Sequence, residues 1–342
     1  YFIQLAKGIG CVSDIAIAGG ISAVIMLGGN MFFLLVLHWG LQGFFWANIG
    51  GQIAPVIYYY IRLRKKCKWK IRIGRALSEE WKNVRNQMLA YSVPLIVVDL
   101  AWWINNAADR YIVALFCGIG ASGILSVSYK IPSIINVFQQ IFIQAWHISG
   151  VKEYGGEKDF YRAMFRWMNL CMCFGGSLLI LLCKPLGRIM FSNEFYMAWK
   201  FVPLLIVSSV VNASAGFVGP ILSARKDSIT MAKSGVYGAI VNVILNVIFV
   251  KLFDIQGAVI ATVISSFVIY SIRKKATEDL LNDNFYNKII FSWMVLIIQA
   301  CLEIRCESFS VQLFFIILVC VIYKCVAKEM LKYVWQFLKG KR

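Results

Sequence analysis

The sequence of 342 residues has little of the side-chain chemistry that most enzymes use. It contains only two histidines, His38 and His147, and the helix pattern described below places them at opposite faces of a membrane. No Ser–His–Asp arrangement or histidine metal site can form from this pair. No P-loop pattern occurs, so nothing indicates ATP use. No predicted outer loop is long enough to hold a catalytic domain, and we therefore predict a protein that is not an enzyme.

Acidic residues are also scarce, because 17 Asp and Glu stand against 35 Lys and Arg, which gives a net charge of +18. In a soluble protein such an excess would indicate nucleic acid binding. Basic residues also collect in the cytoplasmic loops of membrane proteins, and that explanation predicts no nucleic acid partner here. The ten cysteines form no extracellular framework. Cys171 and Cys173 do not share a helix face, so neither a metal nor a cofactor is predicted.

Apolar residues, by contrast, make up 60% of the chain, and the mean hydropathy is +0.70. They are grouped in blocks of roughly 20 residues, the length with which a helix crosses about 30 Å of hydrocarbon. A helix satisfies its own backbone hydrogen bonds inside a membrane. We therefore predict an all-α polytopic membrane protein with about ten transmembrane helices. The predicted spans are 15–37, 40–61, 87–108, 118–147, 163–183, 199–222, 232–250, 256–272, 289–304 and 308–326.

The basic residues predict the orientation of these helices. If the N-terminal end faces the cytoplasm, 28 of the 35 Lys and Arg fall on the inner side and six on the outer side. Ten of the inner residues lie between Arg62 and Arg85. One missed helix would invert every later loop, so this asymmetry supports the helix count. Both ends of the chain are expected in the cytoplasm.

Two segments resemble each other in sequence and in predicted topology. Leu41–Ala47 reads LQGFFWA and Ile255–Ala261 reads IQGAVIA, and each begins a returning helix that ends in a basic exit at Arg62 or Arg273. The two helices are six helices apart, which predicts a six-helix repeat. Four further helices are then expected ahead of Tyr1, in a parent of fourteen. The predicted domains are 1–61 (two helices of an N-terminal lobe), 62–86 (basic linker), 87–275 (six-helix C-terminal lobe) and 276–342 (two extra helices and a basic tail).

Polar side chains inside a span are costly, and they usually face a cavity or a partner. The span 118–147 carries several at spacings of three, four or seven residues, which places them on one helical face. We predict that this face lines a central cavity; hydrogen bonding between packed helices is the alternative. The lining set is Ser126, Lys130, Ser133, Gln140 and Gln144, with Asn136 beside it and Asn30 on the first span as a further member.

Lys130 is the most informative of these residues because it lies deep in its span. Roughly twelve positions, or about 18 Å at 1.5 Å per residue, separate it from the outer end, too far for easy snorkelling. Asp99 lies near the middle of the preceding span. It is a candidate for pairing with Lys130, for binding a coupling cation or for carrying a proton. Asp109 and Arg110 lie at the outer interface, where a local ion pair is expected.

Four short stretches carry a resemblance to a known family. They are Asp109-Arg110-Tyr111, Tyr129-Lys130-Ile131-Pro132, Gln144-Ala145-Trp146 and Lys152-Glu153-Tyr154. With the Gln-Gly repeat helices, they resemble the C-terminal half of the Wzx-type polysaccharide flippases, in the multidrug/oligosaccharidyl-lipid/polysaccharide exporter superfamily. The resemblance implies two six-helix lobes around a central cavity, alternating access, and an undecaprenyl-diphosphate-linked oligosaccharide as substrate.

From this resemblance we expect a flippase of the bacterial inner membrane that serves O-antigen, capsule or exopolysaccharide biosynthesis. The expected partners are the lipid-linked glycan, membrane lipids, H⁺ or Na⁺ as coupling ion, and polysaccharide assembly proteins. A lipid II flippase and a multidrug antiporter are alternatives within the superfamily, although a basic lumen favours an anionic lipid diphosphate over a cationic drug. A membrane-bound glycosyl polymerase or ligase is the alternative from another class, but such enzymes need a large outer loop.

Overall fold

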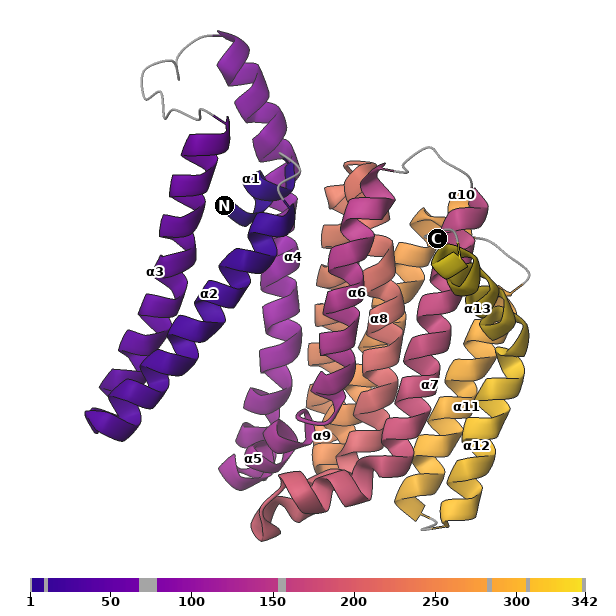
Figure 1. Ribbon diagram of the computed structural model, residues 1–342. Coiled ribbons are helices and arrows are strands. Elements are labelled where there is room, and N and C mark those ends of the chain that lie inside the picture. The colour runs from indigo at the N-terminus through magenta and orange to yellow at the C-terminus, as the bar shows by residue number, and fades with distance from the viewer. Residues whose placement is uncertain are drawn as a thin grey trace. The chain divides into compact units, whose positions relative to one another are not determined.

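The computed structural model describes residues 2–8, 12–67, 79–152, 158–281, 285–305 and 308–339, and all regular structure within these ranges is helical (Figure 1). The chain divides into two compact units, residues 1–84 and residues 85–342. The boundary between them falls within the predicted basic linker 62–86, of which residues 68–78 lie outside the described ranges.

The first unit is built around a pair of antiparallel helices. The helices of this unit are α1 (Phe2–Gly8), α2 (Val12–Met31), the π-helical turn η1 (Phe32–Val36) and α3 (Gly40–Cys67). Ser22 Oγ of α2 donates a hydrogen bond of 2.7 Å to the carbonyl of Gly51 on α3. The chain reverses between them at His38 and Gly40, which both adopt φ of 54°.

The second unit contains the remaining helices, and α8 (Val202–Ala224) is its centre. Almost every residue of α8 from Val202 to Leu222 is buried, and it packs against α6, α7, α9 and α11. The Trp146 ring of α6 stacks on Phe217 of α8 with 4.5 Å between ring centroids. The other elements that complete this unit are α4 (Glu79–Cys117), α5 (Ile119–Ser128), α6 (Pro132–Lys152), α7 (Lys158–Met190), η2 (Asn193–Phe201), α9 (Ser228–Ala276), α10 (Glu278–Leu281), α11 (Tyr286–Arg305), α12 (Phe309–Ile322) and α13 (Lys324–Lys339).

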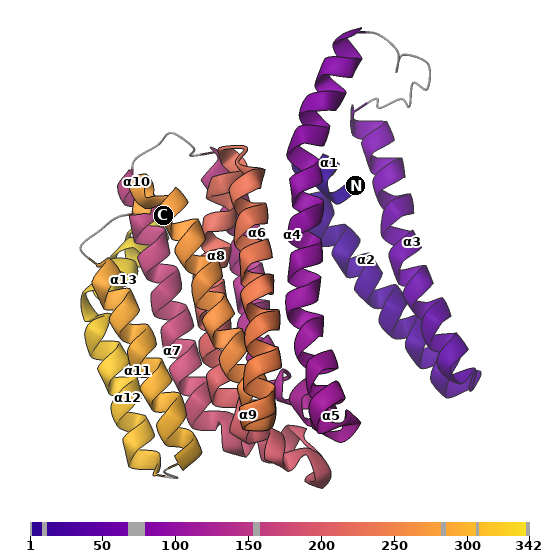
Figure 2. The ribbon, with the colours of Figure 1, turned by 180° about the vertical axis from the view of Figure 1, so that it is seen from behind.

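Helix α9 is in fact two helices that reverse at Asp254, whose φ of 51° is non-helical (Figure 2). Arg273 Nε donates a hydrogen bond of 2.9 Å to Ser234 Oγ, although the two residues are 39 positions apart. At the reversal, Gly257 packs so closely on the Phe249 carbonyl that a Cβ would overlap it. The two halves are therefore antiparallel neighbours, as the separate predicted spans 232–250 and 256–272 require.

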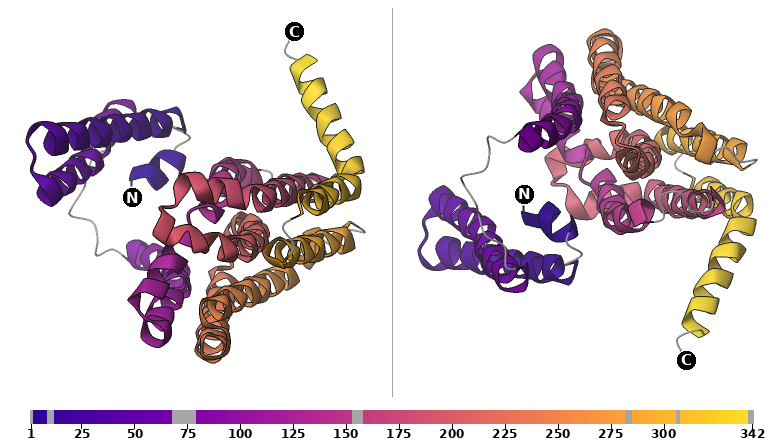
Figure 3. Two further views of the ribbon diagram at one scale, coloured as in Figure 1. Left: turned by 90° about the horizontal axis from the view of Figure 1, so that it is seen from below. Right: turned by 90° about the horizontal axis from the view of Figure 1, so that it is seen from above.

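By length and composition, six of the described helices could each cross a membrane, and the bent pair α12 and α13 could make a seventh. The pair bends by 61°, and Figure 3 shows α13 turned away from α12. The fold class predicted from sequence, an all-α polytopic membrane protein, is confirmed. Helices α3 and α6 are not among the six. In α6 the reason is visible in its amide side chains, which lower the hydropathy of a helix that was predicted to line a cavity.

The prediction of one continuous helix over 118–147 is wrong. Helix α5 ends at Ser128, residues Tyr129 to Ile131 form turns, and α6 begins at Pro132. Proline lacks a backbone N–H and disfavours helical backbone at the residue before it, so Pro132 is well suited to begin a new helix after a break. The spacing that placed Ser126 and Lys130 on the same face as the later residues is therefore interrupted.

The two hairpins that carry the Gln-Gly repeat have similar internal contacts. In the first unit, Arg62 at the exit of α3 reaches back to Asp14 near the start of α2, with 3.3 Å between Nε and Oδ1. In the second unit, Arg273 at the exit of α9 reaches back to Ser234 in the same way. In each hairpin a glycine of the repeat also packs on a phenylalanine of the preceding helix, Gly43 on Phe33 and Gly257 on Phe249. The six-helix repeat and the four-part domain division stay predictions that these contacts support.

Candidate functional site

The most enclosed charged group of the second unit is the carboxylate of Asp109, which has no solvent-exposed surface. It lies on α4, two turns before the end of that helix, and three side chains donate hydrogen bonds of 2.7 Å to it. Tyr129 Oη and Thr262 Oγ1 donate to Oδ2, and Asn246 Nδ2 donates to Oδ1. A buried carboxylate is stable only when such partners compensate for its lost water.

These donors come from segments far apart in the chain. Tyr129 belongs to the turn between α5 and α6, Asn246 to the first half of α9, and Thr262 to its second half. The reversal at Asp254 brings the two halves of α9 together, and the break at Pro132 leaves Tyr129 in a turn beside α4. The Asp109 cluster, defined here as Asp109, Tyr129, Asn242, Asn246 and Thr262, therefore exists only because of both interruptions.

Asn242 completes this cluster and is itself unsatisfied. It is fully buried and lies one turn before Asn246 on the same face of α9. Within the part of the chain that the structure describes, neither polar atom of the Asn242 amide reaches hydrogen-bond geometry, although the side chain lies close enough to the Asp109 carboxylate to interact with it, and Oδ1 of Asn246 has no partner. Thr262 Oγ1 lies within hydrogen-bonding distance of both Asp109 and the Ala258 carbonyl, but its single hydrogen can serve only one of them. The cluster thus holds amide oxygens, Oδ1 of Asn242 and of Asn246, that accept no hydrogen bond among the described residues.

The sequence pointed to Asp109 as an ion-coupling candidate. Tyr129 belonged to one of the four stretches that carry the family resemblance but was assigned no role, and nothing pointed to Thr262. Asn242 and Asn246 are two amide residues within the predicted span 232–250. Their spacing of four residues on one apolar helix was the available signal. The local ion pair expected between Asp109 and Arg110 is not formed in the described structure. Asp109 turns inward, while Arg110 is exposed and lies 5.8 Å from the Tyr129 ring centroid.

The predicted lumen residues lie on exposed or half-buried surface of their own units. Lys130, Ser133, Gln140 and Gln144 are exposed in the second unit, and Ser126 and Asn136 are half-buried. Asn30 is half-buried in the first unit, and its Oδ1 lacks a hydrogen-bond partner among the described residues. Ser133 Oγ donates a hydrogen bond of 2.5 Å to the Lys130 carbonyl, which holds the turn before α6. The exposed amides of α6 form a polar strip on an otherwise apolar unit.

Asp99 is exposed on α4 and forms no ion pair with Lys130 in the described part of the chain. Asp109, ten residues further along the same helix, is the carboxylate that the fold encloses. Of the three candidate roles for Asp99, pairing with Lys130 has no support from the geometry.

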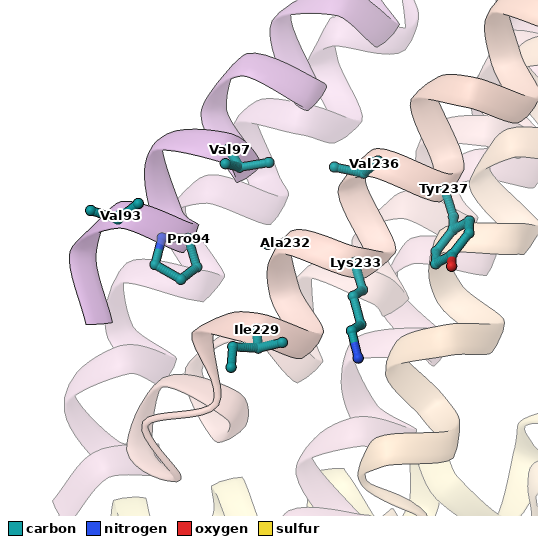
Figure 4. Close-up of a pocket in the computed structure, with 8 residues that line it drawn as sticks. All are labelled: Val93, Pro94, Val97, Ile229, Ala232, Lys233, Val236 and Tyr237. Atoms are coloured by element: carbon teal, nitrogen blue, oxygen red, sulfur yellow. The ribbon is translucent and has the colours of Figure 1, made fainter. Parts of the chain in front are cut away.

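Helices α4 and α9 converge at the Asp109 cluster and enclose a groove nearer the start of each helix. The groove has a volume of about 390 Å³, and Figure 4 shows Val97 of α4 and Val236 of α9 pointing toward one another across it. Pro94 lies in its wall, and Lys233 is its one charged lining residue. Proline permits a helix to bend where it interrupts the backbone hydrogen bonds. The hydrogen bonds of the Asp109 cluster therefore join α4 to α9, at a point further along α4 than the segment around Pro94 where the helix can bend.

A second polar link lies at the opposite end of the bundle. The Arg225 guanidinium donates to the Ala276 carbonyl at 3.0 Å and to the Asp279 carboxylate. This hydrogen bond lowers the pKa of Asp279 below its usual range. The contact joins the end of α8 to the end of α9 outside the apolar segments.

Two comparisons identify proteins that this chain resembles. Residues 20–147 match the family described as "Polysaccharide biosynthesis protein". The chain also superposes on a solved structure described as "Lipid II flippase MurJ, inward closed conformation", with a TM-score of 0.58 and 16% sequence identity over 92% of this chain and 68% of that one. At this identity the structural match shows the fold alone. A search of curated protein sequences found no match. The family match agrees with the resemblance to polysaccharide flippases seen in the sequence, and the structural match shows that the chain shares the fold of a flippase.

The hydrogen bonds of Asp109 predict a difference in stability between two carboxylates of α4. Replacing Asp109 with Ala removes the acceptor for three donors, and each buried donor left unpaired costs about 1–3 kcal/mol. Asp99→Ala changes an exposed side chain and should alter the free energy of unfolding by less than about 0.5 kcal/mol. Thermal unfolding of the detergent-purified variants measures both. Equal unfolding temperatures for the two variants would contradict the compensating role of the cluster.

Proposed function

We propose that this chain, which resembles the polysaccharide flippases, translocates an undecaprenyl-diphosphate-linked oligosaccharide across a membrane by alternating access. The match of residues 20–147 to a polysaccharide biosynthesis family is the observation that carries this proposal. The multi-pass helical fold agrees with it, since a lipid-linked sugar crosses the membrane only through a protein that spans it. The product would serve O-antigen, capsule or exopolysaccharide synthesis.

The physical task explains why such a protein needs a polar surface inside an apolar unit. A diphosphate and a hydrated sugar lose their water when they enter hydrocarbon, and they cross only where compensating groups replace that water. The exposed amides of α6, Gln140 and Gln144, supply neutral hydrogen-bond partners. Lys130 supplies a positive charge at the turn before that helix. A lysine is a point charge on a flexible side chain. It can therefore bind a diphosphate during transport without the rigid bidentate geometry of an arginine.

The Asp109 cluster is our proposed site for the coupling ion. It offers one carboxylate together with neutral amide and hydroxyl oxygens, the hard oxygen ligands that alkali and alkaline-earth cations prefer. With a single negative charge, the set suits a monovalent cation. The described residues contain no group of three or more His, Cys, Asp or Glu that could hold a metal ion. When a cation binds, the Thr262 hydrogen can turn to the Ala258 carbonyl, which frees an oxygen lone pair for the ion.

The position of the Asp109 cluster between α4 and α9 can couple ion binding to the movement of these helices. Asp109 is on α4, whereas Asn242, Asn246 and Thr262 are on α9, so an occupant shared by both sides tightens their junction. Because Pro94 allows α4 to bend below the junction, ion binding can bias the angle of α4 relative to α9. Coupling ions in other transporters bind between elements that move, and we assign Na⁺ or H⁺ this role here.

A lipid II flippase is the second candidate, favoured by the structural match to a protein of that description. Both substrates are polyprenyl diphosphates, and the two functions differ in the sugar that is carried. A multidrug antiporter has less support, because Lys130 favours an anionic cargo. We place the protein in the bacterial inner membrane, with both ends of this chain in the cytoplasm. Contacts with polysaccharide assembly proteins belong to the same proposal.

Deleting the gene should separate the two flippase functions. We expect loss of one surface polysaccharide and accumulation of its lipid-linked repeat unit, with normal growth. Extraction and mass spectrometry of lipid-linked sugars, together with polymer quantification, measure this. Reintroducing the gene is the control and should restore the polymer. Growth arrest with accumulated lipid II would instead support the second candidate and reject the first.

Lys130 should be needed for transport and not for folding. In cells that carry the full gene, we expect Lys130→Ala to reduce polymer export about tenfold or more, since a lost charge contact is worth about 1.5–3 kcal/mol. Lys130→Arg keeps the charge and should retain part of the export. Membrane abundance is measured in parallel by immunoblot. Lys226→Ala, which changes another exposed lysine of the second unit, is the matched control. Normal export by Lys130→Ala at normal abundance would exclude the proposed role.

Binding of a cation to the Asp109 cluster should stabilise the purified protein. We expect the unfolding temperature to rise when NaCl replaces choline chloride at constant ionic strength, because a ligand that binds only the folded state stabilises it. Thr262→Val and Asn242→Leu should abolish the rise, and Asp99→Asn should retain it. If Na⁺ has no effect but proton uptake accompanies transport, the coupling ion is H⁺. A Na⁺-dependent rise that survives in Thr262→Val would place the ion elsewhere.

A further inference from the structure

A large groove of the second unit lies between the second half of α9 and α11. Its volume is about 870 Å³, near the upper end for sites that bind small molecules. Apolar side chains of α9 and α11 line most of it, and η2 and α8 contribute Phe201 and Leu204. The apolar lining includes Ile260 and Ile264 of α9 and Ile297 and Leu302 of α11, with the thiol of Cys301 among them.

The charged residues that line this groove are all basic. Lys200 and Arg305 line it, together with the amide of Gln256, and no acidic residue does. Both cations lie at the end of the bundle that holds the reversal at Asp254, since Lys200 closely precedes α8 and Arg305 ends α11. Across the described ranges, neither side chain forms an ion pair or a hydrogen bond, and both are exposed.

The clustering of these two charges is unusual for this chain. Only six basic residues fall on the side of the membrane that was predicted to be the outer one, and two of those six line a single groove. Their four counterparts on that side have other contacts or positions: Lys184 pairs with Glu303 at 3.4 Å, and Lys251 lies over the Phe116 ring. Within the described ranges, Lys200 and Arg305 are thus two cations without an ion-pair partner at the rim of an apolar groove.

We propose that this groove binds one anionic phospholipid, with its phosphate between Lys200 and Arg305 and an acyl chain along α9 and α11. The two rim cations complement the phosphodiester charge, and Gln256 can donate to a phosphate or ester oxygen. The wall of α9 from Gln256 to Ile264 rises over eight residue steps, or about 12 Å at 1.5 Å per residue. One leaflet has about 15 Å of hydrocarbon, half of the 30 Å core, so the groove matches a single leaflet and not a whole bilayer.

The chemistry favours a bulk phospholipid over the transported substrate. An anionic lipid carries one diffuse charge and needs only the two rim cations. A lipid-linked oligosaccharide also carries a large hydrated sugar, and the groove has only one neutral polar side chain, Gln256, to receive it. The site therefore differs from the proposed transport path at Lys130 and the exposed amides of α6. A bound lipid would fill the space between α9 and α11 and fix the helix pair that bears Thr262.

Native mass spectrometry of the detergent-purified protein tests the proposal. The delipidated protein is titrated with phosphatidylglycerol and, separately, with phosphatidylcholine. We expect one phosphatidylglycerol to be retained at collision energies that remove phosphatidylcholine, and at least tenfold weaker retention by the double variant Lys200→Gln and Arg305→Gln. The matched control is the double variant Lys251→Gln and Arg188→Gln, which removes two cations of the same side outside the groove and should retain the lipid.

Cys301 gives a second readout that needs no charge-removing variant. It is exposed and lines the groove, whereas Cys320 is exposed on α12 outside it. In vesicles with equal parts phosphatidylglycerol and phosphatidylcholine, a bound lipid should slow alkylation of Cys301 by N-ethylmaleimide at least threefold relative to pure phosphatidylcholine, and leave Cys320 unchanged. Equal retention of both lipids, or retention unaffected by the rim variant, would overturn the proposal. Preferential retention of an added undecaprenyl phosphate over phosphatidylglycerol would also overturn it, by assigning the groove to the substrate lipid.

Discussion

A carboxylate enclosed in an apolar helical bundle must find its hydrogen-bond partners inside the protein, and Asp109 finds them on three separate segments. Water is absent from the hydrocarbon core, so each unpaired polar group costs free energy that packing alone does not repay. Tyr129, Asn246 and Thr262 meet this requirement with hydrogen bonds of 2.7 Å. The turn at Pro132 and the reversal at Asp254 both become necessary features, because each presents a donor that a continuous helix would direct elsewhere.

Other buried polar side chains of the second unit also find hydrogen-bond partners on neighbouring helices. Its central helix, α8, pairs its polar side chains with those of neighbouring helices: Ser208 with Ser266 at 2.9 Å and Ser214 with Asn169 at 2.7 Å. Ser177 of α7 likewise donates to Gln299 of α11 at 2.8 Å. Short polar side chains allow close helix packing and specify which helices meet. The bundle is therefore held by many small matched pairs, and the amides exposed on α6 are the exception that calls for a different explanation.

Polar side chains with hydrogen-bond partners inside the unit and polar side chains without them serve different purposes. Groups that find partners within the unit, such as Ser214 and Gln299, are structural. Among the described groups without such partners, three sets bear on function: the exposed strip of α6 with Lys130, the amide of Asn242 beside Asp109, and the two rim cations Lys200 and Arg305. Each set suits a different guest, namely a lipid-linked sugar, a small cation and an anionic phospholipid. An excess of polar capacity over internal partners is what a protein that handles polar cargo in a membrane requires.

The helical class, the approximate positions of the helices and the family resemblance could all be predicted from the sequence. These depend on local properties, because a run of apolar residues long enough to span hydrocarbon must be helical wherever it lies in the chain. Sequence also singled out Asp109, since an acidic residue at the end of an apolar block stands out without any structure. The three-dimensional arrangement was needed to show that Tyr129 leaves the helix, that Asn246 and Thr262 meet across the reversal of α9, and that Lys200 and Arg305 share one groove. Hydropathy records how much of a segment is apolar, whereas the pairing of polar groups depends on which faces of distant helices pack together.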